Sequence, residues 1–391
     1  MSVLPLPTKS RFKPESAEWL TRFLPNAQCD IQRQAQKQLI AQGLPTQKLE
    51  TWGFTNLSRA LQSLPSLKLC SPVISIQNAE VSKILTPWAL SSLPACNDSE
   101  PSLRMMSYAL MDDIYVIDIA PNKNLIAPII IDWSLMELAA AQIIIRVQKN
   151  SSILVEEKYA GEAGLRLGHV VLDLAENARV IHTRQMHDTH DSVVLSTLDI
   201  FTARNAIYEG FILNAGGKLS RTEIYGQLRG EGSEISLNGL QLQRDAQCAD
   251  TTILLEHFAP HCQSNQFYKT ILKDQATGIF QGKIFVDQKA QKTDGYQMSN
   301  GILLSEGTTM QTKPQLEIYA DDVKCSHGTT TGQLDETPLF YLCSRGLTEV
   351  DARRLLLQSA CGDVIEKISQ DELKEKIIQS TKEWLDGLYD D

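Results

Sequence analysis

The chain contains 391 residues, carries a formal net charge of -10 at pH 7 and has a pI near 5.3. This length can bury a substantial hydrophobic core, in one large domain with helical extensions or in two or three ordinary domains. Because the charge is acidic and the sequence holds no block of Lys and Arg, it argues against a nucleic-acid-binding protein and favours one that meets other proteins.

The N-terminal residues MSVLPLPTKSRFKPES contain no apolar segment of the signal-peptide type, and no run of about 18 apolar residues occurs in the sequence. We therefore expect a cytoplasmic protein without a membrane-spanning segment. The eight cysteines lie far apart and show no C-x-x-C spacing, which fits neither a disulfide framework nor a four-cysteine metal site. Most of them are expected to be small buried hydrophobic residues.

Residues 1–65 are predicted to form a helical N-terminal region. Ser16 is a candidate N-cap, and apolar residues recur at helical spacing over Asp30–Gln42 until Gly43 ends the pattern. Short helices are therefore expected here. The next segment, 66–104, carries no specific signal and is treated as a connection.

Residues 105–336 consist of many short β-rich runs separated by Gly, Asn and Asp. The runs recur at intervals of roughly 10 to 20 residues with no convincing helix between them, which excludes a doubly wound α/β domain and leaves a sandwich, a barrel or a β-solenoid. Turn residues stand beside small residues, as in Asn177-Ala178 and Asn205-Ala206, which favours a solenoid of stacked coils, although no strict period is found. The composition alone does not decide between the sandwich and the solenoid.

Residues 337–391 are predicted to be helical. Thr337 as N-cap, Pro338 at the first helical position and Gly346 after the end frame a first helix. Thr348 is expected to begin a second helix, because an acidic residue follows it at the spacing of a capping box.

A third helix is expected to begin at Ser369. On the second helix, the face with Leu355, Leu356 and Ile365 is expected to be buried, while the charged face meets water or a partner. Two interpretations of these helices remain open. They cap the open end of a solenoid, or they dock a partner.

Motifs for catalysis by the chain alone are missing. In GIFQGKI, residues 278–284, the glycine spacing is too short for a P-loop, and Ile284 stands where Ser or Thr is required. No nucleophile elbow, zinc-protease motif or Ser/His/Asp set is present. We therefore expect that the chain does not hydrolyse ATP and is not an enzyme.

A histidine-rich stretch resembles a metal-ligand cluster in the sequence. It contains His182, His187 and His190, together with Asp188 and Asp191. Because His182 and His187 are five positions apart, they would face opposite sides of a continuous strand. We therefore favour a polar turn over a metal site.

The segment 314–357 is the most informative part of the sequence. If Val323 to His327 form a strand, then Val323, Cys325 and His327 share one face, so that a thiol and an imidazole point the same way. The residues alone favour a core cysteine and a hydrogen-bonded histidine over a metal pair. Since the irons of a cluster generally need about four protein ligands in total, any cluster here would require ligands from a partner.

This segment also resembles the SufD family of iron-sulfur cluster assembly proteins, whose members carry a DDV-CSHGATVG-L stretch, then LFYL-SRG and a basic, Leu-rich helix. The residues that match are Asp321, Asp322, Val323, Cys325, Ser326, His327, Gly328, Thr329, Gly332, Leu334, Leu339, Phe340, Tyr341, Leu342, Ser344, Arg345 and Gly346. Thr330, Thr331 and Cys343 depart from the family pattern. The related SufB proteins carry a H-E-A-type sequence at this motif, so the CSHG sequence places the chain on the SufD side.

The resemblance implies a mainly β fold, with a right-handed parallel β-helix (β-solenoid) flanked by helical regions. It implies a non-enzymatic scaffold of the SUF machinery, a SufBCD complex in which this chain pairs with SufB and binds the SufC ATPase. A nascent iron-sulfur cluster would form at the SufB-SufD interface, with His327 as a ligand and Cys325 as an auxiliary thiol. The residues expected to dock SufC are Leu339, Phe340, Leu342, Arg345, Gly346, Arg353, Leu355 and Leu356.

The resemblance has further implications for assembly. No tightly bound cofactor is expected in the isolated subunit, and the chain is expected to pair with itself when SufB is absent. If Cys325 and His327 lie in a closed interface, SufC dimerisation could open it by pulling on the link 332–337. Two alternatives are a β-helix carbohydrate-active lyase or hydrolase, which the lack of a paired-acid motif disfavours, and a self-associating solenoid without a metal role.

A second possible ligand group contains His257, His261 and Cys262. The same segment matches the H-P-S-Q-YK wording of the family through His257, Pro260 and neighbouring residues. A fixed structural corner is therefore favoured, with Cys262 as no more than an extra ligand.

Overall fold

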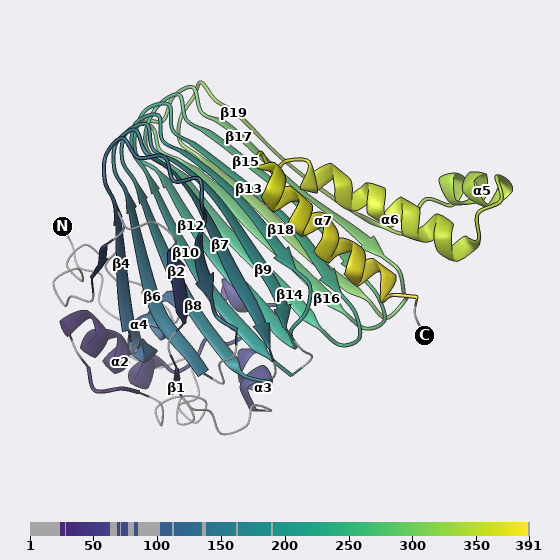
Figure 1. The fold of residues 1–391 in the computed structure, drawn as a ribbon, viewed down its shortest axis with the longest axis horizontal. Coiled ribbons are helices and arrows are strands. Elements are labelled where there is room, and N and C mark those ends of the chain that lie inside the picture. The colour runs from purple at the N-terminus through teal and green to yellow at the C-terminus, as the bar shows by residue number, and fades with distance from the viewer. Residues whose placement is uncertain are drawn as a thin grey trace.

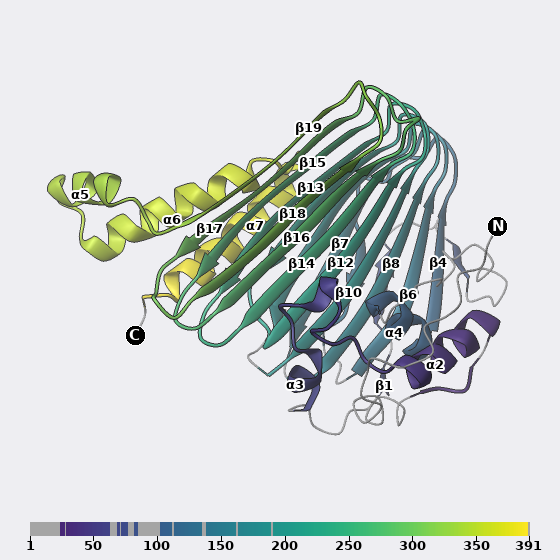
Figure 2. The same cartoon turned by 180° about the vertical axis from the view of Figure 1, so that it is seen from behind.

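In the computed structural model, the structure describes residues 24–27, 29–62, 69–70, 72–76, 82–84, 102–111, 113–134, 138–161, 163–188 and 191–389. The helix predicted after Ser16 lies outside these residues. The described part is built around two long sheets, with N-terminal helices over one sheet and C-terminal helices over the other (Figures 1 and 2).

Two sheets form the body of the molecule. The ten-stranded sheet A contains β1 (Leu69–Cys70), β3 (Ser82–Ile84), β4 (Asp113–Ile119), β6 (Leu138–Val147), β8 (Leu165–Leu174), β10 (Val193–Thr202), β12 (Leu219–Leu228), β14 (Cys248–His257), β16 (Thr277–Val286) and β18 (Thr309–Ile318). The nine-stranded sheet B contains β2 (Val73–Ile76), β5 (Ile129–Asp132), β7 (Ser152–Gly161), β9 (Arg179–Asp188), β11 (Ile207–Asn214), β13 (Glu234–Gln243), β15 (Gln263–Leu272), β17 (Asp294–Leu303) and β19 (Lys324–Gly332).

From β4 onward, successive strands alternate between the two sheets and pair in parallel with the strand one coil away. Val193 of β10 pairs with Leu219 of β12, which in turn pairs with Cys248 of β14. This register, repeated from coil to coil, is that of a parallel β-solenoid. The predicted solenoid is confirmed, and the sandwich alternative is excluded.

An asparagine ladder forms one corner of the first coils. Asn122, Asn150, Asn177 and Asn205 have positive φ angles of 60, 56, 58 and 54°, a conformation that Asn tolerates better than most residues. The Asn150 amide donates to Asn122 Oδ1 at 3.0 Å, Asn177 to Asn150 at 2.9 Å and Asn205 to Asn177 at 3.2 Å. Later positive-φ turns use other residues, such as Asp274, which explains why no strict sequence period is visible.

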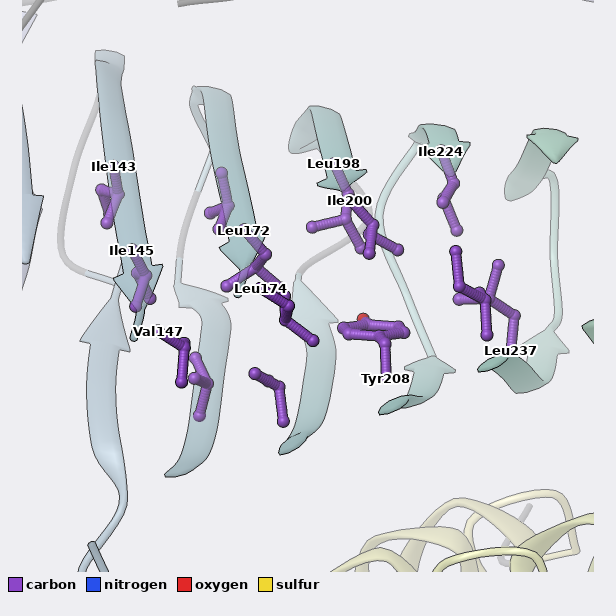
Figure 3. Close-up of a cluster of buried hydrophobic side chains, with 14 of the residues drawn as sticks. Ile143, Ile145, Val147, Leu172, Leu174, Leu198, Ile200, Tyr208, Ile224 and Leu237 are labelled. Atoms are coloured by element: carbon purple, nitrogen blue, oxygen red, sulfur yellow. The ribbon is translucent and has the colours of Figure 1, made fainter. Parts of the chain in front are cut away.

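The inner faces of both sheets contribute aliphatic side chains to one buried cluster (Figure 3). Its labelled members are Ile143, Ile145, Val147, Leu172, Leu174, Leu198, Ile200, Tyr208, Ile224 and Leu237. Full burial of each such aliphatic side chain contributes about 1.5–3 kcal/mol, so this cluster is a main source of the stability of the first coils.

The N-terminal helices pack on the outer face of sheet A (Figure 2). They are α2 (Asp30–Gln42), the 3-10 helix η2 (Glu50–Trp52), α3 (Leu57–Gln62) and α4 (Leu103–Leu110). The helix predicted over Asp30–Gln42 is confirmed, and Gly43 ends it with a φ of 76°. The buried side chains of Leu39, Trp52 and Leu103 share one hydrophobic cluster with side chains of sheet A.

The C-terminal helices are α5 (Glu336–Ser344), α6 (Glu349–Ile365) and α7 (Asp371–Asp386). Thr348 caps α6 as predicted, accepting a hydrogen bond from Asp351 N at 3.1 Å. Gly346, with a φ of 99°, follows α5 as predicted.

The other two predicted N-caps are wrong by one or two residues. Asp335, not Thr337, caps α5, because its carboxylate accepts the Thr337 N–H at 2.8 Å. Gln370, not Ser369, caps α7, and the Ser369 hydroxyl instead donates to Glu209. In both cases a polar side chain close to the predicted cap reaches the first free N–H groups.

Helices α6 and α7 lie across the outer face of sheet B, while α5 projects beyond the sheets (Figure 1). Leu357 and Ile365 of α6 are buried there against residues of β11 and β13. The prediction for Leu355 is wrong, since its side chain is 46% exposed, and Leu356 is only partly buried. The interpretation of these helices as a cap is also wrong, because they cover a face of the solenoid and not its end.

Among the described residues, no helix is long and apolar enough to cross a membrane.

Candidate functional site

The last strands of the two sheets, β18 and β19, form the C-terminal end of the solenoid. In the part of the chain that the structure describes, no strand pairs with their outer edges. Most of β19 is exposed, and the inward residues of β18 are only partly buried. This end therefore presents free backbone N–H and C=O groups and an incompletely covered lumen.

The predicted strand around Cys325 and His327 is present as β19. Cys325 is half-buried and packs with Val323 beside the buried Ile284 and Val286. Burial raises the pKa of the Cys325 thiol, so this sulfur is a protonated core-like group at neutral pH. His327, on the same side of the strand, is exposed, because no further coil covers it.

His327 is in register with Gln297 of the preceding coil, and Cys325 with Gly295. Gln297 is fully buried, and neither of its amide atoms has a hydrogen-bond partner in the structure. The sequence analysis missed Gln297. The signal that could have found it is the two-residue spacing of Gly295, Gln297 and Ser299, which places all three on the inward face of β17. The bounds of this strand could not be set from the sequence.

The strand β19 leads directly into the projecting helices. It ends at Gly332, and α5 begins at Glu336. The two predicted sites, the Cys/His strand and the docking helices, are thus joined by a short linker and are otherwise separate.

The predicted docking residues divide into two groups. Leu339 is buried and Leu342 partly buried, so these two residues hold α5 in place. Phe340 and Leu355 are exposed apolar side chains, at 77% and 46%.

Charged residues flank this surface. The Arg345 guanidinium lies 5.3 Å from the centre of the Tyr341 ring, and Tyr341 is itself 55% exposed. Arg353 pairs with Glu349 at 2.8 Å. We call Phe340, Tyr341 and Leu355 together with these two arginines the helix surface.

Within its described residues, the histidine-rich stretch shows no arrangement of side chains for a metal ion. His182 and His187 lie on one continuous strand, β9, with His182 buried and His187 exposed, as the spacing predicts for a strand. The polar turn favoured from the sequence is wrong for these two residues, because the chain stays extended to Asp188 and buries His182 inside the solenoid. His190 lies outside the described residues. Among the residues that the structure describes, no group of three or more His, Cys, Asp and Glu side chains is arranged to hold a metal ion.

His182 instead belongs to a buried ionic network inside the solenoid. Its Nε2 lies 2.9 Å from Glu157 Oε1, and its Nδ1 is hydrogen-bonded to the Tyr208 hydroxyl at 3.0 Å. Arg184 Nε lies 2.8 Å from the same Glu157 oxygen. Burial raises the pKa of Glu157, but Arg184 and His182 outweigh it and lower that pKa to about 2. Burial lowers the pKa of His182, so this histidine has a structural role as a neutral group.

The segment with His257, His261 and Cys262 forms the corner between β14 and β15. His261 has a φ of 59°, and the buried Cys262 donates to Gly230 O at 3.3 Å. Ser264 Oγ lies 2.9 Å from His257 Nε2, and burial lowers the pKa of His257 to about 4. His257 and Cys262 thus have structural partners at the corner, and His261 contributes its backbone conformation.

The fold and this end of the molecule define a class, that of parallel β-solenoids with an exposed edge strand joined to projecting helices. Residues 132–360 match the model of the SufBD core domain, described as SUF system FeS cluster assembly. The chain belongs to the SufBD family, which confirms the predicted family.

Relatives bear similar names. The chain is 32% identical over 293 residues to the iron-sulfur cluster assembly SufBD family protein slr0076 of Synechocystis sp., covering 70% of this chain and 64% of that protein. It is 35% identical over 216 residues to the iron-sulfur cluster assembly protein SufD of Escherichia coli, covering 55% of this chain and 51% of that protein. It is 30% identical over 242 residues to protein ABCI7, chloroplastic, of Arabidopsis thaliana, covering 60% and 50% respectively. The chain therefore spans between half and two thirds of the length of these relatives.

Proposed function

We propose that this chain is a non-enzymatic scaffold subunit of a SUF-type iron-sulfur cluster assembly machinery in the cytoplasm. It pairs with a SufB-like chain, binds a SufC-like ATPase and lends His327 to a transient cluster, which is its cargo and not a resident cofactor. The observation that carries this proposal is the position of His327, exposed on an edge strand that leads directly into the helix surface.

The open solenoid end is the surface offered to the SufB-like chain. A free edge strand pairs readily with a strand of another chain, and such pairing would extend the sheets across the interface. Exposed Ile318 and Tyr319, at and just beyond the end of β18, add apolar area to this edge. A second copy of the chain would use the same edge when the SufB-like chain is absent.

The chemistry at this edge suits a shared cluster. The imidazole of His327 is exposed and can offer a ring nitrogen to iron, whereas the Cys325 thiol is half-buried and its pKa is raised. A thiol must lose its proton to bind a metal, so Cys325 is an auxiliary group and His327 the ligand. The partner supplies the remaining ligands, since one imidazole cannot hold a cluster.

The helix surface is the docking site for the ATPase. The second half of α6 is anchored on sheet B, while Phe340 and Leu355 on α5 and the first half of α6 remain exposed. An ATPase that moves α5 would act on β19 through the short linker after Gly332. Motion at the helix surface would thereby reach the strand that carries His327.

The test is co-expression of the chain with SufB-like and SufC-like proteins of its source, followed by size-exclusion chromatography with light scattering and iron analysis. A stable three-component complex is expected. His327→Ala should keep the complex and lose most of the assembled cluster, while Ser326→Ala, an exposed neighbour on the opposite face, should retain it. An unchanged cluster yield in His327→Ala would remove the ligand role, and a chain that ignores both proteins would remove the scaffold role.

One observation favours the alternative of a carbohydrate-active enzyme. A cleft of about 390 Å³ on the outer face of sheet B is lined by carboxylates that include Glu209, Glu234 and Asp294. Glu209, however, is held by Arg179 and by the Ser369 hydroxyl. We therefore favour the scaffold, and release of sugars or unsaturated products from polysaccharides by the purified chain would reverse that preference.

A further inference from the structure

A column of glutamines lines the inner face of sheet B next to His327. Leu237, Gln266, Gln297 and His327 occupy equivalent positions in four successive coils. Gln266 and Gln297 are both fully buried. Neither amide oxygen nor amide nitrogen of these two residues has a hydrogen-bond partner in the structure.

Each of the other buried glutamines that the structure describes makes at least one hydrogen bond. Gln241 lies on β13, on the same inner face as Leu237. Its amide nitrogen donates to Thr251 Oγ1 at 2.9 Å, and its amide oxygen accepts from the Thr270 hydroxyl at 2.8 Å. Burying an amide without a partner costs about 1–3 kcal/mol, so the unpartnered amides of Gln266 and Gln297 call for an explanation.

A glycine across the lumen makes room for the Gln297 amide. A methyl group on Gly282 of β16 would overlap the amide nitrogen, carbon and oxygen of Gln297. The amide therefore lies against the Gly282 backbone inside the solenoid, at the last covered coil before the open end.

His327 is the next member of the column after Gln297. Parallel strands lie about 4.8 Å apart, and residues in register project their side chains from the same face. His327 and Gln297 therefore occupy adjacent positions at the mouth of the lumen, within reach of each other, although no hydrogen bond joins their side chains in the structure.

We propose that Gln297 is a positioning residue for His327: when the exposed His327 ring turns towards the lumen, its N–H donates to the Gln297 amide oxygen, and the other ring nitrogen is directed towards the open edge. This inference rests on the proposed function, in which that second nitrogen binds iron. A histidine that binds a metal usually donates its other N–H to an acceptor, which fixes the tautomer and the ring orientation. This hydrogen bond, which is not formed in the structure, would satisfy the buried Gln297 oxygen.

The test follows the tautomer of His327 through its nitrogen chemical shifts in the full-length chain with isotope-labelled histidine, and His327→Ala identifies the signals. One tautomer should dominate in the wild type. Gln297→Met, which keeps the volume but removes the acceptor, should shift the tautomer ratio about fivefold towards an even mixture, as expected for the loss of one hydrogen bond. Gly282→Ala should shift it in the same direction by displacing the amide.

Gln266→Met is the matched control. This residue is equally buried and equally unpartnered but lies one coil further from His327, so its substitution should leave the His327 tautomer ratio unchanged. An unchanged ratio in Gln297→Met, or equal shifts in both variants, would overturn the proposal.

A titration with Co²⁺ separates this proposal from the proposed function. Broadening of the His327 signals should need about tenfold more Co²⁺ in Gln297→Met than in the wild type. If the wild-type His327 signals do not broaden at all, the ligand role fails, while the tautomer ratio still decides whether Gln297 orients the ring.

Discussion

The Arg221 guanidinium lies 3.8 Å from the centre of the Trp52 ring and joins the N-terminal helical region to sheet A. Arg221 is fully buried and pairs with Asp250 and with Glu223, the latter at 2.9 Å. It also donates to Thr51 O at 2.9 Å. The Arg221 guanidinium, paired with carboxylates and a backbone carbonyl, thus makes a cation–π contact with the Trp52 ring, which anchors η2 on the outer face of the solenoid.

Removal of this ring should loosen the N-terminal region. Trp52→Ala is expected to lower the free energy of unfolding by about 3–5 kcal/mol, because it leaves a cavity above a buried charge. The measurement is urea unfolding together with limited proteolysis of the N-terminal region. Phe54→Ala, at an exposed aromatic position nearby, should change stability by no more than about 0.5 kcal/mol, and similar losses in the two variants would contradict the anchoring role.

The buried network inside the solenoid should make stability depend on Glu157. Glu157→Gln leaves Arg184 without its carboxylate and is expected to cost about 3–5 kcal/mol at neutral pH. Because the pKa of Glu157 falls from 4.5 to about 2 on folding, its stabilising effect is present above pH 4.5 and is lost as the pH falls towards 2. Thermal unfolding of both proteins across this range checks the prediction. The exposed Glu231→Gln variant serves as the control. If Glu157→Gln shows the same pH dependence of stability as the wild type, that dependence belongs to other groups.

His257 should produce a separate pH dependence at higher pH. Its pKa falls from 6.5 in the unfolded chain to about 4 in the folded protein, so the unfolded chain binds the extra proton between these values. Stability should therefore decrease by up to about 3 kcal/mol as the pH is lowered from 6.5 to 4. His257→Gln, which can still hydrogen-bond Ser264, should flatten this part of the curve in urea unfolding experiments. An unchanged curve would show that His257 is accessible to protons in the folded protein.

The helix surface should govern binding of the ATPase and not folding. Phe340→Ala removes an exposed aromatic side chain and is expected to weaken binding of the SufC-like protein by about 2 kcal/mol, roughly 30-fold, as measured by calorimetry. Ile40→Ala removes a similarly exposed apolar side chain from α2 and should leave this binding unchanged.

Charge at the same surface offers a second test. Arg353→Glu loses only a surface pair with Glu349, worth about 0.5 kcal/mol, so the chain should stay folded while the affinity for the ATPase falls. A variant that unfolds would show that Arg353 serves the packing of α6, and unimpaired binding would place the docking site elsewhere.

Local signals in the sequence were sufficient for much of the fold. The helix Asp30–Gln42 and its Gly43 end follow from apolar spacing and the conformational freedom of glycine. The Thr348 cap follows from a hydroxyl three residues before an acidic side chain. The segment around Cys325 and His327 was predicted as a strand with both residues on one face, and its wording indicated the family that the SufBD core model then showed.

The tertiary structure alone decided which faces are covered. Leu355 and Leu357 are equally apolar, but only Leu357 meets sheet B, because the position of α6 on that sheet is set by packing that no local pattern records. For the same reason, the sequence could not distinguish helices that cap the solenoid end from helices that lie across its face. The pairing of Gln297 with His327 also depends on the register between coils, and this register arises from corners and buried side chains far apart in the chain. The sequence thus determined the local elements, the candidate ligand and the family, whereas long-range packing decided that His327 lies at an open edge beside an unpartnered buried amide.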